Sequence, residues 1–68
     1  MSNYVNEYKL IIDLQIEINN ISHKILNIKL EQERLPTLYN AVYIVQLENE
    51  KTNLVEYLDN YKSFLFHN

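Results

Sequence analysis

The stretch EQERLPTLYN, residues 31–40, decides the fold, because Pro36 in its middle is the only proline of a chain that contains no glycine. On its N-terminal side, apolar residues recur at alternating intervals of three and four, the seam pattern of packed helices. This first series is Tyr4, Ile11, Leu14, Ile18, Ile21, Ile25, Ile28 and Leu35, and it is interrupted by Glu7 and Gln32. After the proline, a second series begins in another register: Ile44, Leu47, Leu54, Leu58, Tyr61 and Leu65, with Lys51 as its interruption.

The change of register at Pro36 predicts a corner between two helices. Proline disfavours helical geometry in the residue before it and suits the first turn of a new helix. We therefore predict an all-α fold: an antiparallel two-helix hairpin in a single domain, residues 1–68, with helices at about 4–33 and about 37–64, a corner at 34–37, and Leu35 or Thr37 at the cap position. The alternative is one continuous helix kinked at Pro36, because the usual glycine stop signal is missing.

The size of the chain favours self-association. A chain of 68 residues buries too little surface to be more than marginally stable alone, and the absence of cysteine excludes disulfides. The first helix also carries a second apolar face, nearly opposite its main seam. We predict that this face assembles the hairpins into a homodimer, a dimeric four-helix bundle, or a higher assembly; its residues are Val5, Ile12, Ile16, Asn19, Leu26 and Leu30. Asn19, which interrupts the face together with His23, could set the register opposite its symmetry mate. A groove for a different protein is the alternative.

The second helix is expected to bind another protein. It shows one apolar stripe, and the rest of its surface mixes acidic groups with aromatic rings, which act as hot spots in interfaces. The predicted partner-binding residues are Tyr39, Gln46, Glu50, Tyr57, Phe64 and Phe66. The aromatic residues have a second interpretation, a plug in which Tyr4 and Tyr8 meet Tyr57, Tyr61 and Phe64 at the open end. The last residues could also simply fray.

Nothing in the sequence indicates catalysis. His23 and His67 have no acid or nucleophile at a productive spacing, no ligand pair suits a metal, and phosphate-binding loops need glycine. We therefore predict a protein that is not an enzyme and needs no metal or cofactor. The net charge of −3, without a basic surplus in either half, disfavours nucleic acid and anionic membranes.

These observations leave two classes of function. The first is a small interaction module, such as a phage- or plasmid-type regulator or inhibitor that binds a larger host protein. The second is a structural assembly component, such as a scaffold or capsid accessory protein. The longest apolar run, residues 41–45, is far shorter than the roughly 20 residues that a membrane helix needs. We expect a cytoplasmic protein, in the host cytoplasm if it is phage-encoded.

Overall fold

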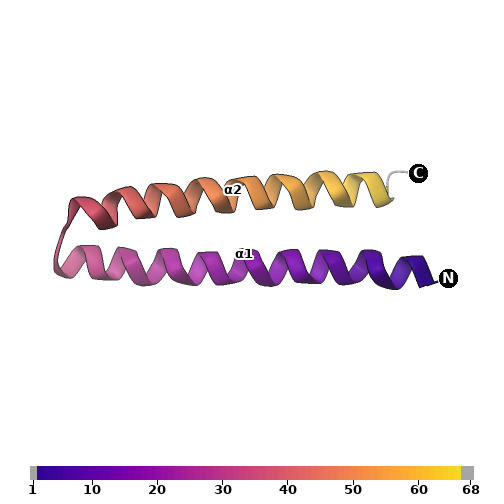
Figure 1. The fold of residues 1–68 in the computed structure, drawn as a ribbon, viewed down its shortest axis with the longest axis horizontal. Coiled ribbons are helices and arrows are strands. Elements are labelled where there is room, and N and C mark those ends of the chain that lie inside the picture. Colours follow the sequence, from indigo (N-terminus) through magenta and orange to yellow (C-terminus); the bar gives the residue numbers. More distant parts are fainter. Residues whose placement is uncertain (1, 67–68) are drawn as a thin grey trace.

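The computed structural model describes residues 2–66, with side chains from Asn6 onward, and consists of two long helices joined by a short corner. Helix α1 spans Ser2–Arg34 and helix α2 spans Leu38–Phe66. They lie antiparallel, so that the start of α1 and the end of α2 lie at one end of the molecule and the corner forms the other (Figure 1). The hairpin measures 52 × 16 × 12 Å. The predicted all-α antiparallel hairpin is confirmed, and the alternative of a continuous kinked helix is wrong.

The corner occupies Leu35–Thr37, between the two helices. Arg34, which we predicted within the corner, belongs to the last turn of α1, where its positive charge suits the helix dipole. The backbone N–H of Leu35 still donates to the carbonyl oxygen of Glu31 at 2.9 Å. Pro36 has no N–H to donate, so the helical ladder cannot continue.

Thr37 starts α2. Its side-chain oxygen Oγ1 accepts a hydrogen bond from the backbone N–H of Asn40 at 3.0 Å, and its carbonyl oxygen accepts from the N–H of Ala41 at 3.1 Å. This is the geometry of a threonine N-cap, which satisfies one of the otherwise unpaired N–H groups of the first turn. The prediction of Thr37 as a cap is confirmed.

Gln32 closes the corner from the side of α1. Its side-chain Nε2 donates to the carbonyl oxygen of Thr37 at 3.0 Å, and its Oε1 accepts from the N–H of Thr37 at 2.9 Å. This double contact explains why a polar residue interrupts the first apolar series. Over the described residues the backbone takes no positive φ angle, so the corner needs no residue in the left-handed region. The absence of glycine is therefore compatible with a tight corner.

The buried core consists of two clusters along the hairpin. Toward the open end, Ile11 and Leu14 of α1 pack with Leu58 of α2. Toward the corner, Ile21 and Ile25 pack with Leu47. Leu54 is partly buried against both clusters. The two predicted apolar series are thus the faces by which α1 and α2 contact each other.

Leu35 corrects the end of the first series. We predicted that it would extend the apolar seam, but it is 71% exposed. The reason is that α1 ends at Arg34, so the helical spacing no longer directs residue 35 toward α2.

Candidate interaction surfaces

The first surface runs along the side of α1 that faces away from α2. Ile12, Ile16, Leu26 and Leu30 are 52–55% exposed, although each is a large aliphatic side chain. Asn19 and His23 lie exposed between the two apolar pairs. We call Ile12, Ile16, Asn19, His23, Leu26 and Leu30 the outer α1 face. The structure places the predicted self-association residues here, except for Val5, whose side chain lies outside the described part.

The position of this face follows from the heptad spacing. Ile21 and Ile25 are buried toward α2. Ile16, Leu26 and Leu30 each lie five residues before or after one of them, a rotation of about 140° around the helix, so they point away from α2. A surface helix normally keeps that side polar. Four half-exposed aliphatic side chains on one helix are therefore an unsatisfied packing surface within the single chain.

The second surface lies on α2. Tyr39, Gln46, Glu50, Tyr57 and Phe64 are all exposed and are separated by intervals of seven or four residues, which keeps them on one side of the helix. We call these five residues the α2 aromatic stripe. The ring of Tyr57 stacks on Tyr61, with centroids 6.5 Å apart and planes 4° apart. Tyr61 in turn packs against the cluster of Ile11, Leu14 and Leu58, so the ring of Tyr57 rests on a side chain that contacts the core. Phe64 is 78% exposed and packs against neither cluster.

Phe66, the sixth predicted partner-binding residue, lies on another side of α2. Its ring contacts Tyr8 of α1, with centroids 6.1 Å apart and planes inclined by 37°. The position of Phe66 in the sequence indicated no packing role, and the contact with Tyr8 supplies one. It also shows that Tyr8 meets Phe66 at the open end, whereas we expected it to meet Tyr57, Tyr61 and Phe64. The side chain of Tyr4 lies outside the described residues.

A third surface was missed. Leu38, Val42 and Val45 are exposed on the first three turns of α2, spaced as neighbours along one side of the helix. We call them the α2 corner stripe. We expected a single apolar stripe on this helix, and that expectation is wrong near the corner. The intervals of four and three between these residues were the signal that could have revealed the second stripe.

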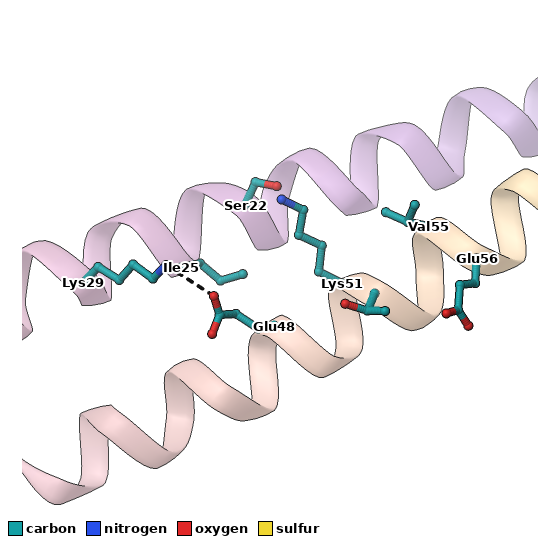
Figure 2. Close-up of a pocket in the computed structure, with 8 residues that line it drawn as sticks. Ser22, Ile25, Lys29, Glu48, Lys51, Val55 and Glu56 are labelled. Carbon is teal, nitrogen blue, oxygen red and sulfur yellow. Dashed lines mark hydrogen bonds and ion pairs between the residues drawn. The ribbon is translucent and has the colours of Figure 1, made fainter.

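A depression of about 380 Å³ lies between the helices at mid-length (Figure 2). It is lined by Ser22, Ile25 and Lys29 of α1 and by Glu48, Lys51, Thr52, Val55 and Glu56 of α2. Nζ of Lys29 and Oε2 of Glu48 lie 3.3 Å apart at its rim. The side chain of Lys51 extends from α2 toward Ser22 (Figure 2). Lys51 interrupts the second apolar series, and its extended side chain places the ammonium group at the edge of the core.

This depression has the composition of a surface groove between two helices. Both members of the Lys29–Glu48 pair are about half exposed, so solvent screens their attraction. Two basic and two acidic side chains line it, and no side-chain nitrogen or oxygen of the described residues is buried without a partner. The groove therefore offers little that would select a particular ligand.

The described residues hold no group of three or more His, Cys, Asp or Glu side chains arranged to bind a metal ion. His23 is exposed on the outer α1 face, and His67 lies outside the described residues. Within residues 2–66, neither helix has a stretch that is both long and apolar enough to cross a bilayer. No family model, curated protein or solved structure matches the chain.

Proposed function

We propose that this protein is a non-enzymatic interaction module that pairs with a second copy of itself and docks on a larger host protein. Its role would be that of a small phage- or plasmid-type regulator or inhibitor acting in the cytoplasm. One observation carries the proposal: among the described side chains, thirteen large apolar residues are about half exposed or more, whereas only six are buried. A chain that exposes more large apolar side chains than it buries is suited to forming interfaces.

The surfaces divide between two partners. The outer α1 face is aliphatic and suits a second copy, which would give a homodimer with four helices in total and would bury apolar surface that the 68-residue hairpin leaves exposed. The α2 aromatic stripe combines tyrosine and phenylalanine rings with Gln46 and Glu50, a composition typical of contacts with a different protein. The net charge of −3 favours a host surface with basic groups over nucleic acid.

Phe64→Ala is the best variant for testing the docking role. Phe64 is 78% exposed and belongs to neither buried cluster, so its loss should leave the melting temperature unchanged. The control is Thr52→Ala, an exposed polar residue of α2 that lies two residues after Glu50 and therefore points away from the α2 aromatic stripe. Tagged wild-type protein and both variants would be incubated with an extract of the host cell.

We expect the wild-type protein and the Thr52→Ala variant to retain one host protein in a stoichiometric amount and the Phe64→Ala variant to lose it. Equal retention by all three proteins contradicts the assignment of the α2 aromatic stripe. A wild-type protein that retains nothing contradicts the docking role itself.

A structural assembly component is the second candidate, and the α2 corner stripe favours it. If Leu38, Val42 and Val45 of one copy met the outer α1 face of another, the contact would be heterologous and could continue into an open array. Light scattering over a concentration series separates the two candidates. A regulator should stop growing at a defined oligomer, whereas a scaffold should keep growing as concentration rises.

A further inference from the structure

The outer α1 face has the same pattern in both directions along the helix. With Lys9 and Glu33 added at its two ends, its residues are spaced at alternating intervals of three and four over eight positions. Residues at equal distances before and after Ile21 are of the same class: aliphatic with aliphatic, polar with polar, and charged with oppositely charged. The matched pairs are Lys9 with Glu33, Ile12 with Leu30, Ile16 with Leu26, and Asn19 with His23. All eight side chains are exposed in the hairpin.

We propose that a second copy of this chain covers the outer α1 face in an antiparallel, two-fold symmetric pairing centred at the level of Ile21. This inference rests on the self-association in the proposed function and adds its orientation and register. In a two-fold interface, if residue i of one copy contacts residue j of the other, then j also contacts i. The outer α1 face satisfies this condition, because its residues form matched pairs on the two sides of Ile21.

The apolar pairs form the two halves of the interface. Ile12 lies against the partner's Leu30, and Ile16 lies against the partner's Leu26. Symmetry repeats both contacts, so every half-exposed aliphatic side chain of the face gains an aliphatic neighbour. Between Lys9 and Glu33 the contact is about 36 Å long at 1.5 Å per residue, which is most of the length of α1.

The polar pairs fall where they complement one another. Asn19 meets the partner's His23 on each side of the two-fold axis, and an amide can donate to or accept from a neutral imidazole ring. Lys9 meets the partner's Glu33 at each end of the contact, so opposite charges come together. Within the described residues the only ion pair is between Lys29 and Glu48, so neither Lys9 nor Glu33 forms an ion pair with another described residue.

The pattern disfavours the other arrangements. A parallel pairing in register, which would set Asn19 opposite its symmetry mate, also sets Lys9 against the partner's Lys9 and Glu33 against the partner's Glu33. Like charges directly opposed are destabilising. An antiparallel pairing shifted by seven residues in one direction buries Ile16 against the partner's Glu33. The same shift in the other direction buries it against the partner's Asn19.

The arrangement also fixes the shape of the dimer. The outer α1 face lies nearly opposite the side of α1 that contacts α2. The four helices therefore lie in a row, in the order α2, α1, α1 of the partner and α2 of the partner, rather than around one common core. Both α2 aromatic stripes stay uncovered in this row, which leaves them available to a host protein.

Distances between spin labels test the orientation, and the absence of cysteine from the chain allows each label to be placed at one introduced cysteine. The two sites are Asn20→Cys and Asp13→Cys, both exposed beside the outer α1 face. Paired helices lie 8–10 Å apart, so labels at position 20, close to the two-fold axis, should be roughly 10 Å apart. Labels at position 13 should be separated by a further 24 Å or so along the helix, which gives about 26 Å in total.

A parallel dimer would give short distances, about 10 Å, at both positions, and a dimer through another surface would give long distances at both. Either result overturns the antiparallel pairing but leaves self-association standing. A chain that remains monomeric at the labelling concentration overturns both, so the two failures are distinguishable.

Charge exchange at the ends of the contact provides a second test. Lys9→Glu places two like-charge contacts in an antiparallel dimer. It should raise the dissociation constant of the dimer roughly tenfold at low ionic strength. The double variant Lys9→Glu with Glu33→Lys should restore the wild-type value. In a parallel dimer, Lys9→Glu exchanges one like-charge contact for another, so an unchanged dissociation constant, or a double variant without rescue, overturns the proposal.

Discussion

Replacing Gln32 with alanine removes both hydrogen bonds by which the end of α1 holds Thr37. These bonds measure 3.0 and 2.9 Å, and they are the side-chain contacts that span the corner. The net contribution of one such bond to stability is about 0.5–1.5 kcal/mol. Both bonds are exposed to solvent, which can replace part of what is lost, so we expect the free energy of unfolding to fall by about 1–2 kcal/mol.

For a domain of this size, that loss lowers the melting temperature by about 5–15 °C. The assay is thermal unfolding followed by circular dichroism at one fixed protein concentration, because self-association makes the melting temperature depend on concentration. The matched control is Gln15→Ala, an exposed glutamine in the middle of α1. Alanine is the better helix former, so the control should melt at the wild-type temperature or slightly above it. If Gln32→Ala behaves like this control, Gln32 does not close the corner.

Four further substitutions test the packing. Leu58→Ala should lower the free energy of unfolding by about 2–5 kcal/mol, because Leu58 is 5% exposed within a buried cluster. Leu35→Ala at the exposed corner should lower it by less than about 1 kcal/mol. Equal losses in urea unfolding would contradict the assigned core. Lys51→Leu should raise the free energy of unfolding by about 1 kcal/mol, since it continues the apolar series between Leu47 and Leu54 with an apolar side chain. A lower stability would mean that the ammonium group makes a necessary contact. Lys29→Ala should cost less than about 0.5 kcal/mol, and the cost should vanish in high salt, because its ion pair with Glu48 is half exposed; a larger, salt-independent cost would contradict this description.

The hairpin itself could be predicted from the sequence because two apolar series in different registers cannot share one straight helix. Pro36 marked the place where the register changed, and Thr37 had the side chain of an N-cap. The role of Gln32 could not be predicted in this way. A periodic pattern records only that the residue is polar, whereas its function depends on two backbone groups of Thr37 that come within reach only when the corner has formed.

The candidate surfaces show a similar division. The outer α1 face was predictable, because its residues lie at fixed positions relative to the buried seam of the same helix. The contact between Tyr8 and Phe66 was not, because it depends on how far the open ends of the two helices are offset, and that offset is set by the length of the corner. Leu38, Val42 and Val45 were missed for a different reason: a short stripe next to a long one adds little to the periodicity of the whole helix.

Sedimentation equilibrium at micromolar concentration tests most directly whether the outer α1 face is covered by a second copy. The chain has a mass of 8.2 kDa. We predict a species of twice that mass for the wild-type protein, and a monomer when Ile16→Asp and Leu26→Asp place carboxylates in the middle of the apolar pairs, with the helical circular dichroism of the hairpin retained. A wild-type protein that sediments as a single species of 8.2 kDa would contradict the account.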